Sequence, residues 1–326
     1  MPISTQRALP HGIIAQLFRR GEVVPFLGAG VNMGCRPPGA RWEPGRSDFL
    51  PSGFELSRYL ANEAAYPYAE ERELADLAKV ASYFVESSDR SILREQLRTV
   101  FNRDYQPGAI HTLLAEVAAV HPLLIVTTNY DDLTERAFKA AGQPYDLVVY
   151  PTDQPDWEAG LLLWRHGEDE PERVLANNVP VDLATTNVIY KMHGTVNRQD
   201  PRYDSYVITE DDYVEFLTRM INETAVPAQF LHHFRRRSFL FLGYGLGDWN
   251  LRVVLKHLRE VDLGAALGGA ARGPGVVDGG ELRRSWAVQF QPTALDEFLW
   301  DRRRVIIFDA DINAVAEKLR ETLTAP

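Results

Sequence analysis

Short apolar runs that end in glycine or polar residues recur along the chain. Between them, apolar residues repeat at helical spacing, as at Leu74, Leu77, Ala78, Ala81 and Phe84. Such runs predict buried strands, at residues 23–27, 123–126, 147–150, 188–192, 238–242, 286–290 and 305–308. Helices are predicted at 12–20, 110–120, 211–222, 227–236 and 250–261. The alternation predicts an α/β fold, a Rossmann-like parallel sheet with helices on both faces.

The pattern predicts one domain over residues 1–326, with additions to the sheet. Residues 54–106 carry several helical patterns and are expected to form a helical layer or insert. Residues 151–187 have no dominant period and are expected to be an irregular insert. The segment from Met33 to Pro51, rich in Gly, Pro and Arg, is expected to be a long loop beyond the first strand, and loops of this length are often functional or mobile.

Composition narrows the choice of partners and compartments. The net charge of -10 favours a ligand held by local backbone donors over long nucleic acid, so no direct contact with nucleic acid is expected. A single cysteine, Cys35, excludes an internal disulfide and a zinc site built from paired cysteines. No segment approaches the length of a membrane span, so we expect a cytoplasmic protein without a membrane partner.

Two glycine turns follow predicted strands. Gly28-Ala29-Gly30 is a turn that can bring backbone N–H groups close to a pyrophosphate, although many such turns are only tight turns. Met33 stands where the third glycine of a GxGxxG motif would fall. The second turn, Gly243-x-Gly245-x-Gly247-Asp248, follows a later strand. Because ligands of parallel sheets bind at the carboxyl ends of strands, both turns are candidates to meet in one crevice.

Polar residues follow three other strands. Asp132 and Glu135 have the spacing of a capping box, which leaves Asn129 without a structural task and free to point into the crevice. His193 can exchange a proton near neutral pH, but a lone histidine at a strand end is more often structural. Asp309 is interpreted as a helix cap in preference to an adenine contact.

Taken together, four motifs resemble, in order and placement, those of the Sir2 family, and most closely the Sir2-like domains of bacterial anti-phage defence proteins. The motifs are Gly28-Ala29-Gly30-Val31-Asn32, Thr128-Asn129-Tyr130-Asp131, Met192-His193-Gly194 and Gly243-Tyr244-Gly245. The resemblance implies that NAD+ is the ligand and that Gly28, Ala29, Gly30 and Asn32 lie at its pyrophosphate.

By the same resemblance, Asn129 and Asp131 would contact the ribose and carboxamide, and His193 would match the catalytic histidine. Gly243, Tyr244 and Gly245 would line the adenosine side. The segment from Met33 to Pro51 would be the mobile loop over the nicotinamide end.

The chain also departs from the sirtuin pattern. Asn32 and Thr128 stand where sirtuins usually carry serine and glutamine. Sirtuin deacylases use a four-cysteine zinc module to form the acyl-lysine groove, which one cysteine cannot build, and residues 54–106 would occupy part of that space. Without that groove, water is the simplest acceptor. The expected activity is therefore metal-free hydrolysis of NAD+ to nicotinamide and ADP-ribose. The alternatives are a non-catalytic sensor of NAD+ or an ADP-ribose derivative, and an NAD-dependent protein deacylase.

The resemblance further implies a role in antiviral defence. Related domains deplete NAD+ in infected cells, as in abortive infection, under control of a sensor such as an Argonaute, a STAND ATPase or a HerA-type ATPase. Since the printed chain leaves no room for such a sensor, we expect a separate activating partner or further residues beyond those printed. Low basal activity and control by homo-oligomer assembly are also expected, because an enzyme that is always active would harm its host.

Overall fold

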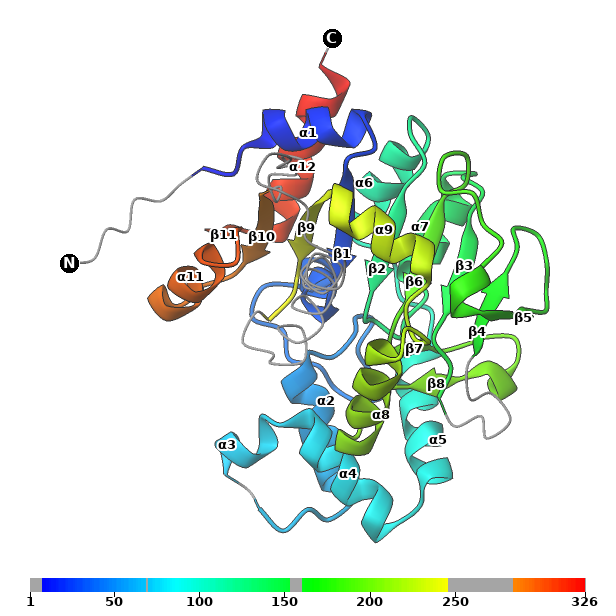
Figure 1. The fold of residues 1–326 in the computed structure, drawn as a ribbon. Coiled ribbons are helices and arrows are strands. Elements are labelled where there is room, and N and C mark those ends of the chain that lie inside the picture. The colour runs from blue at the N-terminus through cyan, green and yellow to red at the C-terminus, as the bar shows by residue number, and fades with distance from the viewer. Residues whose placement is uncertain (1–7, 69, 153–159, 246–283, 326) are drawn as a thin grey trace, which may run out of the picture.

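The fold is described from a computed structural model, for residues 8–68, 70–152, 160–245 and 284–325 (Figure 1). Its α-helices are α1 (His11–Arg19), α2 (Gly53–Glu63), α3 (Glu71–Leu74), α4 (Leu77–Ser87), α5 (Arg90–Phe101), α6 (Ala109–Ala118), α7 (Leu133–Ala140), α8 (Glu210–Ile221), α9 (Ala228–Arg236), α11 (Ala294–Asp301) and α12 (Ile312–Thr324). Short 3-10 helices cover Ala29–Cys35, Ala176–Asn178 and Pro201–Tyr203. The predicted helix at 250–261, with Gly247 and Asp248, lies outside the described residues.

Nine strands form one sheet in the order β11-β10-β9-β1-β2-β6-β3-β4-β5. They are β1 (Val23–Leu27), β2 (Leu124–Thr127), β3 (Asp146–Val149), β4 (Gly160–Trp164), β5 (Glu172–Leu175), β6 (Val188–Lys191), β9 (Ser238–Leu242), β10 (Ser285–Gln289) and β11 (Val305–Asp309). The pairs from β11 to β3 are parallel, as predicted, and β4 and β5 join antiparallel. A separate two-stranded ribbon pairs β7 (Gly194–Thr195) with β8 (Ser205–Tyr206).

The apolar residues of the strands alternate between two cores. Val23, Ile125 and Leu240 face α1, α6, α7 and α12, whereas Phe26 and Phe241 face α8, α9 and α11. Helices therefore cover both faces of the sheet (Figure 1), which confirms the predicted fold class. No described helix has the length and apolar character needed to cross a membrane.

The predicted helical segment 54–106 holds α2 to α5, drawn in blue to cyan below the sheet in Figure 1. Apolar side chains of α2, α4 and α5 form a third core with Tyr130 and Leu133, which follow β2. This layer therefore packs against the carboxyl end of the sheet, where parallel sheets bind ligands.

Two details of the sequence analysis differ from the structure. The segment 151–187, expected to be irregular, contains β4 and β5. Asp311 caps α12 by accepting hydrogen bonds from two backbone N–H groups, whereas Asp309 accepts one from the Gln291 N–H, 2.9 Å away. The interpretation of Asp309 as a cap is therefore wrong.

The loop between β1 and α2, expected to be mobile, is packed against the helical layer. Trp42, Phe49 and Leu50 are buried in it. The Arg36 guanidinium donates to both Glu55 carboxylate oxygens, at 3.0 and 2.6 Å. Glu55 also accepts from the Trp42 N–H. Any opening of this loop must break these contacts.

Burial alone would raise the pKa of Glu55, but the Arg36 guanidinium and the backbone N–H groups of Trp42 and Ser52 outweigh it and lower the pKa from 4.5 to about 2. The stability that follows from this shift is present above pH 4.5 and is lost as the pH falls toward 2. The charged form of Glu55 thus fixes the loop at neutral pH.

We expect Glu55→Gln to lower the melting temperature at pH 7 by several degrees, with the difference from wild type shrinking as the pH falls from 4.5 toward 2. Calorimetry from pH 7 to pH 2.5 measures this. Glu43→Gln is the matched control, because the Glu43 carboxylate forms an exposed ion pair with Arg46. An equal difference at every pH would contradict the role of the Glu55 charge.

Candidate active site

The four predicted motifs line one cavity of about 550 Å³ at the carboxyl end of the sheet. This volume is within the range of small-molecule sites, roughly 300 to 1,000 Å³. All ten residues predicted for the site lie in its wall: Gly28, Ala29, Gly30, Asn32, Asn129, Asp131, His193, Gly243, Tyr244 and Gly245. They come together because β9, β1, β2 and β6 are neighbouring parallel strands that end at the same edge.

The two glycine turns pack backbone against backbone. The Gly28 N–H donates to the Leu242 carbonyl and the Gly30 N–H to the Gly243 carbonyl, at 3.0 and 2.7 Å. A Cβ atom on Gly30 would lie 2.5 Å from the Gly243 oxygen, and Gly243 has a φ of +65°. Close approach of the turns therefore requires Gly30 and Gly243 whatever ligand binds.

The turn after β2 is fixed by hydrogen bonds of Thr127, the last residue of the strand, and of Asn129. The Thr127 hydroxyl donates to the Leu27 carbonyl at 3.2 Å and accepts from the Asn129 N–H at 3.0 Å. The Asn129 side-chain amide donates to the Gly28 carbonyl at 3.3 Å. Its Oδ1 atom is buried and has no partner among the described residues. Asn129 lines the cavity, so its wall contains a buried amide oxygen that no described donor uses.

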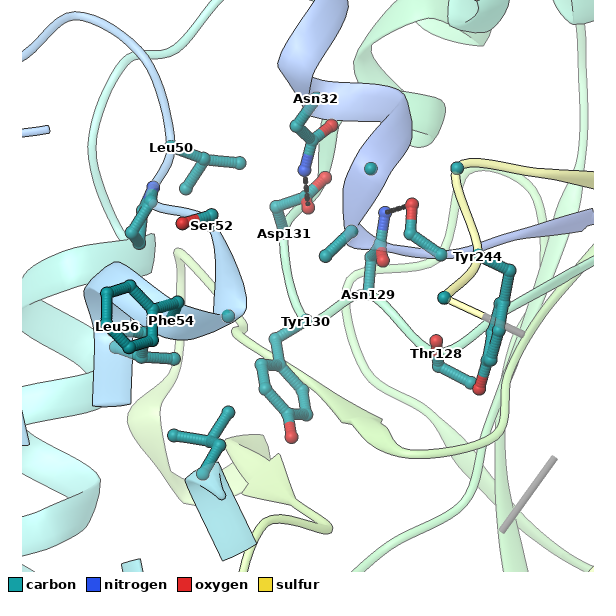
Figure 2. A pocket seen from close by; sticks show the side chains of 18 of the residues that line it. Asn32, Leu50, Ser52, Phe54, Leu56, Thr128, Asn129, Tyr130, Asp131 and Tyr244 are labelled. Carbon is teal, nitrogen blue, oxygen red and sulfur yellow. Dashed lines mark hydrogen bonds between the residues drawn. The ribbon is translucent and has the colours of Figure 1, made fainter. Parts of the chain in front are cut away.

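Asp131 orients Asn32 across the cavity wall, as the dashed line in Figure 2 marks. The Asn32 Nδ2 donates to Asp131 Oδ2 at 2.9 Å, and the Leu133 N–H donates to Asp131 Oδ1 at 3.1 Å. Both carboxylate oxygens of Asp131 are thus engaged. Asn32 Oδ1 is buried without a partner in the described part of the chain, so Asn32 offers the cavity a second amide oxygen.

The capping box predicted from Asp132 and Glu135 is wrong. Asp132 stands at the N-cap of α7 but makes no side-chain capping bond, and its carboxylate pairs instead with Arg198 at 2.7 Å. Asp131 takes over the task by accepting from the Leu133 N–H. Glu135 turns toward Lys191 and accepts from its ammonium at 2.9 Å.

Sequence reasoning missed Lys191, the last residue of β6. Its side chain has 0% exposure, and its ammonium contacts the carbonyl oxygens of Tyr130 and Asp131 as well as Glu135. A signal was present, because a lysine in an otherwise apolar strand must find partners if it is buried. Burial raises the pKa of Glu135, and the ammonium of Lys191 opposes this rise.

His193 is buried beside aromatic rings. Its imidazole packs edge-on against Tyr213 and Phe216, with ring centroids 5.4 and 5.2 Å apart. Burial lowers the pKa of His193 from 6.5 to about 3. The expectation that His193 titrates near neutral pH is therefore wrong for the cavity as described, and the ring is neutral at pH 7.

The opposite wall of the cavity comes from the helical layer and from the end of the loop before α2. Its side chains are largely apolar: Leu50, Pro51, Phe54, Leu56, Ala75, Leu77 and Phe101. Figure 2 shows Leu50, Phe54 and Leu56 across the cavity from Asn129. Polar groups thus converge from the sheet, and the helices supply an apolar surface. No group of three or more potential metal ligands occurs in the described ranges.

Comparisons with known proteins agree with the motifs. Residues 123–267 match the family model described as a SIR2-like domain. Defense-associated sirtuin 2 of Bacillus subtilis is 22% identical over 76% of this chain and 20% of its own length. NAD(+) hydrolase ThsA of Cytobacillus dafuensis is 27% identical over 64% of this chain and 35% of its own. The ThsA of Enterococcus faecium is 26% identical over 76% and 42%.

The chain thus spans about a fifth to two fifths of the length of these relatives. A solved structure described as "Structural Basis for the Mechanism and Regulation of Sir2 Enzymes" covers 96% of both chains at 12% identity. Its TM-score of 0.39 is too low to carry an argument.

We expect Gly30→Ala to destabilise the protein by about 2 kcal/mol or more, because its Cβ atom would force the two turns apart. Thermal or urea unfolding measures the loss. Gly245→Ala is the control: it lines the same cavity, but a Cβ atom there meets none of the described atoms within 4 Å. Equal stability of both variants would mean that the backbone contact is unimportant.

The His193 ring is expected to stay neutral between pH 5 and 8, because burial lowers its pKa to about 3. Nitrogen NMR of histidine-labelled protein, with His193→Gln to assign the signal, tests this directly. The other seven of the eight histidines provide reference signals in the same spectra. A midpoint between pH 6 and 7 for His193 would disprove the expected burial.

Proposed function

Because this chain carries a SIR2-like domain, we propose that its cavity binds NAD+ and that the protein hydrolyses the bond between nicotinamide and ribose. One observation carries the proposal: two buried amide oxygens without described partners and a neutral imidazole line the same cavity. Relatives with the name NAD(+) hydrolase support the choice of reaction.

The proposed orientation of NAD+ follows the order of the motifs. The pyrophosphate lies at Gly28, Ala29 and Gly30, which line the cavity without bulky side chains. The adenosine lies toward the turn with Gly243, Tyr244 and Gly245, and the nicotinamide ribose lies between Asn129 and His193. Asn32, which the resemblance placed at the pyrophosphate, is assigned instead to the carboxamide or a ribose hydroxyl, because its unpartnered Oδ1 is an acceptor and a phosphate oxygen offers it no hydrogen.

The proposed reaction needs groups that are stable beside a positive charge on the ribose. When the bond from C1′ to the nicotinamide nitrogen breaks, its electron pair neutralises the nicotinamide ring and the ribose becomes oxocarbenium-like. The amide oxygen of Asn129 presents the negative end of its dipole to this charge and to the attacking water. Water adds its oxygen to C1′ and releases a proton.

The low pKa of His193 agrees with a proton transfer that follows the breaking of the bond to nicotinamide. An imidazolium beside the cationic ribose would place two positive charges together, so a ring that stays neutral suits the bond-breaking step. His193 accepts a hydrogen bond from the water or a ribose hydroxyl. It takes the proton only as the new bond to C1′ removes the positive charge from the ribose.

We infer a role in antiviral defence, in which activation depletes cellular NAD+. The relative named defense-associated sirtuin supports this role. Control by a separate partner such as a HerA-type ATPase, a STAND ATPase or an Argonaute, together with homo-oligomer assembly, would keep basal activity low. That control is part of the proposal, since uncontrolled hydrolysis would deplete the NAD+ of the host cell.

We expect wild type, incubated with NAD+ and with neighbouring-gene products as activators, to release nicotinamide and ADP-ribose, measured by chromatography. Asn129→Ala and His193→Ala should lower kcat/KM by about 10²- to 10³-fold, since each removes one group at the reacting carbon. His166→Ala, at an exposed histidine outside the cavity, is the control.

The alternatives predict other products. Tight binding of NAD+ that stays unchanged would select a sensor, and an O-acyl-ADP-ribose formed with an acyl-lysine peptide would select a deacylase. Equal rates for wild type, Asn129→Ala and His193→Ala would remove both residues from the mechanism.

A further inference from the structure

We propose that Lys191, with Glu135, is a positioning residue that holds the Asn129 turn in its reactive geometry. The inference rests on the proposed function. Lys191 does not line the cavity and does not touch the expected position of the substrate. It acts from behind the turn, through backbone contacts.

The position of Lys191 in the sheet places it under that turn. It is the final residue of β6, paired in parallel register with Thr127 of β2 and Val149 of β3. Its side chain has 0% exposure. The chain that follows β2 passes over it, so the ammonium meets the backbone of residues 130 and 131.

All three donors of the ammonium are used there. They point to the carbonyl oxygens of Tyr130, at 3.2 Å, and of Asp131, and to Glu135 Oε1 at 2.9 Å. The Tyr130 carbonyl accepts in addition from the Val196 N–H, which follows the ribbon strand after His193. The two loops that carry Asn129 and His193 are thus tied together at Tyr130.

We infer that these contacts set the positions of the Asn129 and Asn32 side chains in the cavity wall. Asn129 immediately precedes Tyr130, so the direction of its side chain depends on the backbone that Lys191 holds. Asp131 sets the amide of Asn32 through a 2.9 Å hydrogen bond. Loss of the ammonium would therefore disturb both amide oxygens that we assign to substrate.

The charge itself has no net benefit for folding that an apolar pair could not supply. Desolvation of a buried ion pair offsets most of its attraction, and apolar replacements of similar size are often as stable. A methionine pair would fill the space but donate nothing to the carbonyls. Mutation can therefore separate the positioning of the Asn129 turn from the stability of the fold.

The test compares Lys191→Met, the double variant Lys191→Met/Glu135→Met and the control Lys139→Met. Lys139 is an exposed lysine on the same helix as Glu135. The single variant leaves the Glu135 carboxylate buried without its cation, so it is expected to lose stability as well as position. The double variant removes both charges.

We expect the double variant to melt closer to wild type than Lys191→Met does. Its kcat for NAD+ hydrolysis should still fall at least tenfold, with KM changed less than threefold. Hydrogen exchange of the segment 128–133 should quicken, while exchange of β1 and β6 stays as in wild type. Lys139→Met should match wild type in every measurement.

Recovery of kcat along with stability in the double variant would overturn the proposal, since Lys191 would then serve folding alone. If wild type releases no nicotinamide, the proposed function fails by itself. Hydrogen exchange then decides: unchanged exchange at 128–133 in the double variant overturns the positioning role, and faster exchange supports it.

Discussion

Parallel pairing of β9, β1, β2 and β6 is the constraint on which the site depends. The four strands run in the same direction, so the residues that follow Leu242, Leu27, Thr127 and Lys191 must leave the sheet at one edge. Apolar cores on both faces fix the register, because a slip by one residue would move every side chain of the strand from one core to the other. The cavity is the space that these four exits and the helical layer enclose.

Around that space, the turns are hydrogen-bonded to one another. The glycine turn after β1 packs against the one after β9, and Asn129 donates to the Gly28 carbonyl. Tyr130 accepts from the chain after His193 and from Lys191. Residues from four distant segments thus form one hydrogen-bonded unit.

The sheet and the composition of the site followed from sequence because both rest on local patterns. Buried parallel strands read as apolar runs, and the residue types that end them mark the crevice. Strand β5 was missed because its exposed edge position carries no apolar run, as Glu172 and Arg173 show. Strand β4, Gly160–Trp164, is an apolar run, but the proline, aspartate and asparagine residues around it are typical of loops and favoured an irregular segment.

The sequence alone does not predict ion pairs, pKa shifts or close contacts that depend on residues from other elements. Spacing suggested a cap for Glu135, yet Lys191 on β6 draws its carboxylate inward. The low pKa of His193 depends on burial against Tyr213 and Phe216, residues about twenty positions away. The need for glycine at position 30 depends on the carbonyl of Gly243. Each of these requires the fold to be known first.

The electrostatics of the unit suit a reaction that passes through a cation. Lys191 brings a full positive charge close to the cavity wall, which would oppose an oxocarbenium-like ribose if it stood alone. Glu135 and two backbone carbonyls surround the ammonium, so their negative ends offset its field within the cavity, where the ribose is proposed to bind. The groups that do face the cavity are amide oxygens and a neutral imidazole. The site can therefore use a buried lysine to order its backbone without placing a repelling charge beside the bond that is proposed to break.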